Sequence, residues 1–181
     1  MKIIALSGSL RRDSYNTRLA RLMVDMAPDG VTIESATLHG IPLYDGDLEE
    51  SDGIPAAVSE LRDRIKASAG LILITPEYNA GMPGVLKNGL DWLTRPGEEM
   101  KPTFSKRPTA LAGATPGAWG TALAQSGALI NLRQLGVNLF PDYLRISRAH
   151  EVFNDAGVDQ KQREQVDRWL QAFAEFIGGS E

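Results

Sequence analysis

The chain of 181 residues contains no cysteine, and this absence excludes several chemistries at once. Disulfides, a redox-active Cys-x-x-Cys pair, a thiolate nucleophile and cysteine-ligated iron–sulfur or zinc sites all require that residue. Histidine is also scarce, because His39 and His150 are the only two and neither has another at metal-ligand spacing. The scarcity of histidine disfavours both a histidine metal centre and a Ser-His-Asp triad. We therefore expect no metal site and no catalytic side chain, with the chemistry of any enzyme carried by a bound cofactor.

Long apolar runs and blocks of one charge are lacking too. No run approaches the roughly 20 apolar residues needed to span a bilayer. The apolar stretch at residues 3–6 is short, and Arg11, Arg12 and Asp13 soon follow it, so we expect a cytoplasmic protein without a signal peptide. The formal net charge is −4 with no basic stripe, which disfavours nucleic acid as a partner. Length and composition predict one globular domain spanning residues 1–181.

Short apolar runs alternate with helical periodicity along the chain. Strands are predicted at residues 3–6, 31–34, 71–75, 109–113 and 137–140, with an extended piece at 144–147. Helices are predicted around residues 19–26, 55–65, 84–93, 118–135 and 159–177, and surface loops at 39–53 and 96–108. Several strands are continuously apolar, which is typical of a parallel sheet covered on both faces. The pattern predicts a doubly wound α/β domain, whose ligands bind beyond the carboxyl ends of the strands.

Three loops lie at that edge, and the first of them has the parts of an anion site. It matches neither the dinucleotide-binding GxGxxG pattern nor the P-loop. Backbone N–H groups at the start of the following helix favour an anion. Ser9, Ser14, Asn16 and Thr17 offer uncharged donors, and Arg11 could bind a phosphate with two hydrogen bonds. The alternative is that Ser14 or Asn16 only caps the helix while Arg11 is a solvated surface charge.

The second and third loops are suited to a flat ligand. In the second, prolines and glycines fix the backbone around Tyr78, an aromatic side chain, and Asn79, which could bind the rim of a heteroaromatic ring. Glu77 is either a general base or a carboxylate that caps a turn, and the lack of a partner carboxylate or histidine favours the cap. The third loop, residues 113–120, contains three glycines and is weak evidence alone. Together the loops predict a crevice for a phosphate at one end and a planar ring at the other.

Several motifs now stand together, and the residues that form them are Gly8-Ser9-Leu10-Arg11-x-x-Ser14-x-Asn16, Ile41-Pro42-Leu43-Tyr44-Asp45, Pro76-Glu77-Tyr78-Asn79 and Pro83-Gly84-x-Leu86-Lys87-Asn88-x-x-Asp91-Trp92. In these motifs the chain resembles the NADPH-dependent FMN reductase family, and within it the bacterial chromate reductase or NAD(P)H:quinone oxidoreductase type. The resemblance covers nearly the whole chain. We interpret Lys87, Asp91 and Trp92 as structural or interface residues.

The resemblance implies a flavodoxin-like fold, a five-stranded parallel sheet in the order 2-1-3-4-5, with FMN as cofactor and NADPH or NADH as co-substrate. It places the FMN phosphate on the first loop and the isoalloxazine on the second, with the third loop completing the ring site. The residues assigned to the cofactor are Ser9, Arg11, Ser14, Tyr15, Asn16, Thr17, Pro76, Glu77, Tyr78, Asn79, Thr115 and Gly117. The chain departs most from the family in the third loop, where Trp119 makes the sequence bulkier.

The activity that the resemblance implies is a ping-pong oxidoreductase, in which NAD(P)H reduces FMN and a second substrate reoxidises it. Quinones, flavins, azo or nitro compounds and chromate are the candidate acceptors. Relatives form dimers or tetramers, and the helix at 118–135 favours a homo-oligomer because Trp119, Leu123, Ile130 and Leu132 spread over more than one of its faces, with Trp92 on the preceding helix. Two alternatives remain open: a flavodoxin-like electron carrier without its own NAD(P)H oxidation, and a non-catalytic module that binds another phosphorylated ligand.

Overall fold

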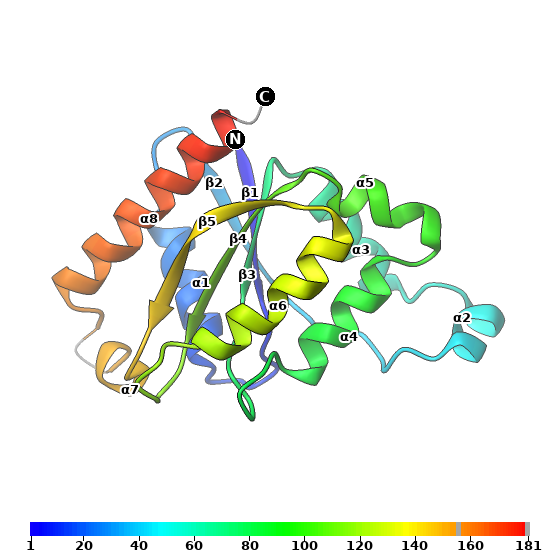
Figure 1. Ribbon diagram of the computed structural model, residues 1–181, viewed down its shortest axis with the longest axis horizontal. Helices are drawn as coiled ribbons and strands as arrows, with labels where there is room; N and C mark the ends of the chain where they lie inside the picture. The colour runs from blue at the N-terminus through cyan, green and yellow to red at the C-terminus, as the bar shows by residue number, and fades with distance from the viewer. Residues whose placement is uncertain (155–156, 180–181) are drawn as a thin grey trace.

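A five-stranded, fully parallel sheet forms the centre of the computed structural model, which describes residues 1–154 and 157–179 (Figure 1). The strand order is β2-β1-β3-β4-β5, as the resemblance implied for a flavodoxin-like fold. The strands are β1 (Lys2–Ser7), β2 (Thr32–Thr37), β3 (Gly70–Ile74), β4 (Pro108–Ala114) and β5 (Asn138–Ile146). Because all five run the same way, their carboxyl ends meet at one edge, which is the lower edge in Figure 1.

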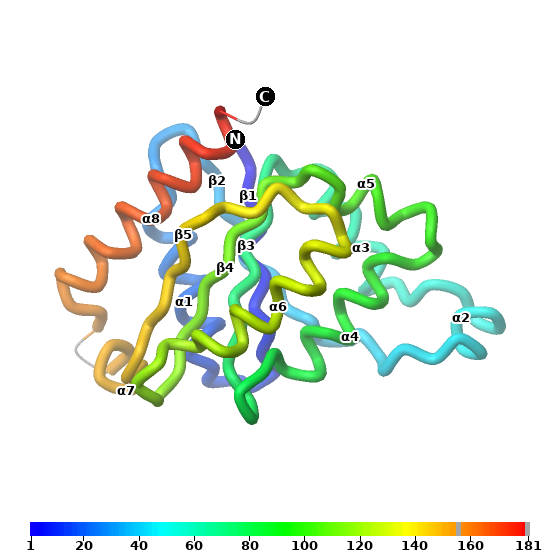
Figure 2. The backbone as a smooth tube through the Cα atoms, viewed as in Figure 1, coloured from blue at the N-terminus to red at the C-terminus, as the bar shows by residue number. Residues whose placement is uncertain are grey.

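Helices cover both faces of the sheet (Figures 1 and 2). One face carries α1 (Tyr15–Asp25) and α8 (Gln160–Gly178), and the other carries α3 (Ala56–Lys66), α4 (Gly84–Leu93), α5 (Met100–Phe104) and α6 (Ala122–Leu135). The short helices α2 (Gly46–Asp52) and α7 (Ala149–Val152) and the 3-10 turn η1 (Gly97–Glu99) complete the order. Among the described residues, no helix combines the length and apolarity that a membrane span requires.

The apolar core is divided by the sheet into two clusters, and this division explains the continuously apolar strands. In β1, Ile3 and Ala5 pack with residues of α1 and α8, whereas Ile4 and Leu6 pack with residues of α3, α4 and α6. Successive side chains of a strand point to opposite faces. A strand buried on both faces therefore needs apolar residues at every position, which is the pattern that predicted it.

Two predicted loops contain short helices, so those predictions were wrong. Residues 39–53 include α2, which begins where the Asp45 carboxylate accepts a hydrogen bond from the Asp47 N–H (3.0 Å). None of its residues is buried, so it has no apolar periodicity to detect. Residues 96–108 include η1 and α5, and Phe104 of α5 is fully buried. Five residues are too few to display a helical period of 3.6.

The last strand and the helix before it also differ from prediction. The two extended pieces at 137–140 and 144–147 are one strand, β5, whose register against β4 shifts between Thr109 and Leu111. The exposed Pro141 lies at this irregularity, where a residue without an N–H is tolerated. Helix α6 begins four residues later than predicted, since Gly120 and Thr121 adopt positive φ angles of 56° and 64° and form a turn.

Candidate active site

The three predicted loops meet in one pocket at the carboxyl edge of the sheet, where Figure 1 shows the segments after β1, β3 and β4 gathered together. The residues that line this pocket are Ser9, Arg11, Ser14, Tyr15, Asn16, Pro76, Glu77, Tyr78, Ala114, Thr115 and Pro116. Most of the predicted cofactor residues are among them. Thr17, Asn79 and Gly117 are not, and Ala114 and Pro116 had no signal of their own in the sequence.

Ser14 caps α1, and the way it does so leaves a donor for a ligand. Its hydroxyl oxygen accepts hydrogen bonds from the backbone N–H groups of Asn16 (3.2 Å) and Thr17 (3.4 Å). The Ser9 hydroxyl oxygen accepts in the same way from the Arg11 N–H (3.3 Å). A hydroxyl that accepts with its oxygen still has its hydrogen to donate. The capping alternative is therefore right for Ser14, and it is compatible with a contact to an anion.

Arg11 is the cation in the pocket lining, and it forms no ion pair with another described residue. The neighbouring Arg12 differs, because its side chain is 94% exposed and its Nε lies 3.8 Å from the Asp13 carboxylate. An unpaired guanidinium beside two serine hydroxyls and the start of α1 is a chemically suitable cradle for a phosphate. The residues present at this end of the pocket therefore fit the phosphate group of FMN.

Asn16 and Thr17 have partners within the fold. Asn16 is buried, and its carboxamide pairs with the backbone of Ala114: Nδ2 donates to the carbonyl (3.0 Å) and Oδ1 accepts from the N–H (2.9 Å). The Thr17 hydroxyl lies 3.0 Å from the hydroxyl of Ser7, at the end of β1. Both side chains thus connect α1 to strand ends.

The second loop ends in a tight hairpin. Tyr78 and Gly81 exchange two backbone hydrogen bonds of 3.1 Å, and the two residues between them, Asn79 and Ala80, have φ angles of 51° and 60°. Positive φ at both central positions is the geometry of a type I′ turn. Tyr78 lies at the rim of the pocket and is 48% exposed, so its ring is available to a planar ligand. Asn79 lies at the hairpin tip, outside the pocket lining.

Glu77 acts as a cap, although of a helix rather than of a turn. Its Oε2 accepts hydrogen bonds from the N–H groups of Leu123 (2.9 Å) and Ala124 (3.0 Å), in the first turn of α6. The N-cap residue of α6, Thr121, makes no side-chain capping bond of its own. A carboxylate is favourable at this position, since the N-terminus of a helix carries partial positive charge.

The third loop is held from β5. The N–H of Thr115 donates to Ile146 (3.0 Å), and the carbonyl of Thr115 accepts from the N–H of Ala149 (2.9 Å). The carbonyl of Gly117 accepts from the N–H of Arg148 (3.0 Å), which places this glycine against the β5–α7 connection. Thr115 remains in the pocket lining, beside the second loop.

Some residues of the sequence motifs lie outside the pocket. They attach the segment that precedes α2 to helix α4. Asn88 accepts from the N–H of Tyr44 (2.8 Å) and donates to the carbonyl of Pro42 (2.8 Å), and the indole of Trp92 donates to the same carbonyl (2.9 Å). Trp92 is fully buried by its own chain, so it is structural and does not belong to an interface. Lys87 pairs with Asp91 at 2.7 Å.

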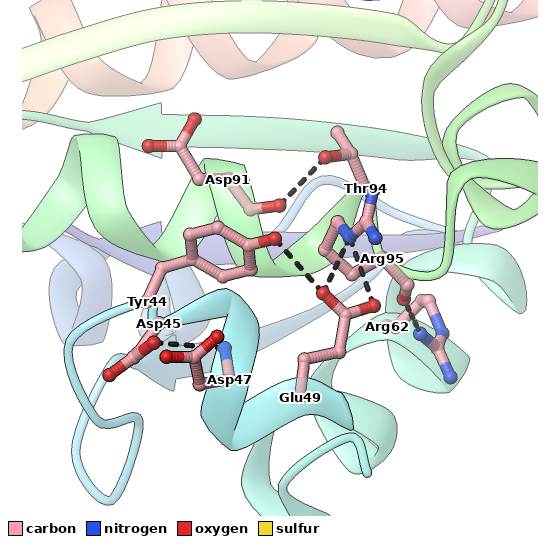
Figure 3. A network of polar contacts seen from close by, with 8 residues as sticks. All are labelled: Tyr44, Asp45, Asp47, Glu49, Arg62, Asp91, Thr94 and Arg95. Carbon is pink, nitrogen blue, oxygen red and sulfur yellow. Dashed lines mark hydrogen bonds and ion pairs between the residues drawn. The ribbon is translucent and has the colours of Figure 1, made fainter. Parts of the chain in front are cut away.

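An ionic contact completes this attachment (Figure 3). Glu49 on α2 accepts from Arg95 Nε (2.8 and 3.0 Å) and from the hydroxyl of Tyr44 (3.0 Å). The hydrogen bond from Arg95 lowers the pKa of Glu49 below its ordinary value. The hydrogen bond to Glu49 raises the pKa of Tyr44. Helix α2 has no fully buried residue, and these polar contacts hold it together with the partly buried Leu48, which packs against the core.

Comparison with known proteins gives a consistent result. Residues 1–151 match the family described as NADPH-dependent FMN reductase. An NAD(P)H-dependent FMN reductase of Pseudomonas aeruginosa is 41% identical, over 98% of this chain and 95% of that protein. A 2-hydroxy-1,4-benzoquinone reductase of a Burkholderia species is 33% identical, over 98% of this chain and 96% of that protein.

A solved structure agrees with these relatives. It is a flavoenzyme NAD(P)H:(acceptor) oxidoreductase of Paracoccus denitrificans, with a TM-score of 0.82 and 29% identity over 99% of this chain and 98% of that one. The match to the family model covers far more than half of the chain. The protein therefore belongs to the NADPH-dependent FMN reductase family, with FMN as its cofactor and a reduced nicotinamide as its electron donor.

Proposed function

We propose that this chain is an NAD(P)H-dependent reductase of quinones and free flavins, working by a ping-pong cycle. The single observation that supports this most is the pocket itself, whose lining brings Arg11 and the hydroxyls of Ser9 and Ser14 together with Tyr78 and Thr115. When bound, FMN supplies the redox chemistry, since it can accept a hydride from a nicotinamide and pass electrons to an acceptor.

The chain's own contribution is binding and orientation. Arg11 and the serine hydroxyls neutralise and hold the phosphate, while the second and third loops fix the plane of the ring. The half-exposed Tyr78 at the rim leaves an open side. A nicotinamide and an acceptor would occupy that side in turn, which is why we propose a ping-pong order.

Acceptors of several kinds are compatible with such an open site. Quinones come first, because similar proteins are named for their reduction. Azo and nitro compounds and chromate extend the proposal, since none requires a dedicated catalytic side chain. We place the protein in the cytoplasm, where reduced nicotinamides are made.

The test is an absorbance spectrum followed by steady-state kinetics. The purified protein should carry a flavin spectrum, and it should consume NADPH or NADH continuously with a benzoquinone as acceptor. Varying both substrates should give parallel double-reciprocal lines. A flavin-containing protein that oxidises no nicotinamide would instead be an electron carrier, and one that remains colourless after incubation with FMN would be a binding module for another ligand.

We also propose that the protein is a homo-oligomer. Leu123 and Ile130 lie seven residues apart on one side of α6 and are 53% and 78% exposed, and Trp119, in the turn before the helix, is 76% exposed. Leu132 is buried by the chain itself and adds nothing to this surface. Exposed apolar side chains in a row are typical of a protein interface. Light scattering should give at least a dimer, and Ile130→Glu should shift the mass towards the monomer; a wild-type monomer at micromolar concentration would contradict the proposal.

A further inference from the structure

A buried amide of the FMN phosphate loop spans the active site. Asn16 lies in the first turn of α1, and its carboxamide exchanges two hydrogen bonds with the backbone of Ala114, the last residue of β4. Strand β3 lies between β1 and β4 in the sheet, so these two segments are not neighbours in the strand order. The contact joins residues 98 positions apart in the chain.

Both ends of this contact belong to the lining of the pocket. Asn16 follows Ser14 and Tyr15, on the phosphate side, and Ala114 precedes Thr115 and Pro116, on the ring side. Helix α1 also packs with β4 in the apolar core, whereas Ser14 bonds within its own helix and Thr115 bonds to Ile146 and Ala149. The carboxamide is thus a direct polar link between the first and third loops.

Both polar atoms of the Asn16 side chain take part in this contact. The side chain is 3% exposed, with Nδ2 and Oδ1 both directed at the peptide groups of Ala114. A side-chain amide that pairs with one residue's N–H and C=O reproduces the bonding of a neighbouring strand. The contact uses one Nδ2 hydrogen and one Oδ1 lone pair, and at 3% exposure little of the side chain is left open to the pocket.

We propose that Asn16 is a positioning residue, which sets the distance between the phosphate loop and the ring loop and does not itself bind FMN. The inference rests on the FMN site described above and revises the role that sequence motifs suggest for this residue. Catalytic groups need such support, because a site held loosely by about 1 Å loses much of its function.

The two roles predict different ligand dependence. A phosphate ligand contributes to the binding of FMN but not to that of riboflavin, which lacks the phosphate. A positioning residue affects both, because losing it loosens the ring loop as well. Two buried hydrogen bonds correspond to about a tenfold change in affinity. Asn16→Ala should therefore weaken FMN and riboflavin by similar factors of about ten.

The experiment is titration of the flavin-free protein with FMN and with riboflavin, together with visible circular dichroism of the bound flavin at saturation. The dichroism reports how the ring is held, and it should decrease in Asn16→Ala even when every site is filled. The matched control is Asn88→Ala, which removes the same kind of amide-to-backbone pair, to Pro42 and Tyr44, outside the pocket. That variant should lose thermal stability yet retain the wild-type dichroism and the wild-type affinity for both flavins.

A second variant keeps the test decisive if Asn16→Ala folds poorly. In Asn16→Asp a neutral carboxyl group offers one donor and one acceptor, as the amide does, whereas the charged form cannot donate to the Ala114 carbonyl. Its riboflavin affinity and dichroism should therefore recover as the pH is lowered, while those of the wild type stay constant over the same range.

Three results would overturn the inference. One is a loss of FMN affinity in Asn16→Ala with riboflavin unchanged, which would make Asn16 a phosphate ligand. Another is wild-type dichroism and affinity in a folded Asn16→Ala. The third is Asn88→Ala reproducing every change, which would mean a general loss of stability. Failure of the FMN site itself would look different, since the wild type would then bind neither flavin.

Discussion

The carboxylate of Glu77 lies 2.9 Å from the backbone nitrogen of Leu123, so a residue of the second active-site loop caps the helix that follows the third. The same oxygen accepts from Ala124 at 3.0 Å. The two loops on the ring side of the pocket are therefore linked through the start of α6. The first residue of α6 with an exposed apolar side chain, Leu123, is part of that link.

This cap predicts a measurable contribution to stability. Glu77→Ala should lower the free energy of unfolding by about 0.5–2 kcal/mol, as loss of a helix cap does. Glu77→Gln keeps an acceptor but loses the charge at the helix terminus, so it should cost about 0.3–1 kcal/mol. Urea denaturation of the flavin-free protein measures both. Two variants as stable as the wild type would show that the contact contributes nothing.

The hairpin of the second loop predicts that a different substitution, Ala80→Gly, raises the free energy of unfolding. Ala80 has a φ of 60°, a left-handed conformation that costs a residue with a Cβ roughly 1–2 kcal/mol. Ala80→Gly removes this strain but makes the unfolded chain more flexible, so a net stabilisation of about 0.5–1 kcal/mol is expected. The matched control is Ala174→Gly inside α8, where the same change should destabilise by about 1 kcal/mol. Equal destabilisation of both variants, in urea, would refute the strain.

The limits of prediction from the sequence follow from the range of each interaction. The strands of the sheet were predicted because burial on both faces leaves a local apolar run. Ser14 was identified because a cap binds backbone N–H groups only two and three residues further on. The partner of Asn16 is 98 residues away and that of Glu77 is 46 residues away. Residue type alone cannot say whether an amide in such a loop faces a ligand or a strand end. Helices α2 and α5 were missed for another reason, because a helix of seven or five residues is too short to show an apolar period.

The ion pair between Glu49 on α2 and Arg95, just after α4, predicts a pH-dependent stability. Arg95 lowers the pKa of Glu49 in the folded protein, below an ordinary value of 4.5. A carboxyl group with a lowered folded pKa stabilises the fold above the unfolded pKa, and this stabilisation is lost as the pH falls through the folded pKa. Glu49→Gln should therefore be less stable than the wild type at pH 7, and the difference should shrink as the pH falls below 4.5.

Denaturant melts of both proteins at a series of pH values test this. Glu50→Gln is the control, since Glu50 lies on the same helix, is exposed and forms no ion pair with a described residue. Its stability relative to the wild type should not follow the same pH course. A Glu49→Gln difference that is constant from pH 7 down to pH 3 would contradict the role of the charge.

Arg11 gives the last prediction, because it is the cation in the pocket lining. A phosphate near neutral pH carries roughly −1.5 to −2 charge, and the serine hydroxyls around it are uncharged. A charge-assisted contact contributes about 1.5–3 kcal/mol. Arg11→Ala should therefore weaken FMN binding by roughly ten- to a hundredfold, at about 1.4 kcal/mol per decade. Arg11→Lys should recover only part of the loss, because lysine lacks the two-pronged contact of the guanidinium.

Arg12→Ala is the matched control, since that side chain is 94% exposed and is directed towards Asp13. FMN titration of the flavin-free variants, in parallel with riboflavin, separates the possible roles. Riboflavin affinity should be unchanged in Arg11→Ala, in contrast to the equal loss of both flavins expected for Asn16→Ala. If Arg11→Ala weakened both flavins equally, the arginine would be supporting the loop or the ring and not the phosphate. If Arg12→Ala caused the larger loss of FMN, the phosphate would lie on the outer side of the loop, against the geometry of the pocket.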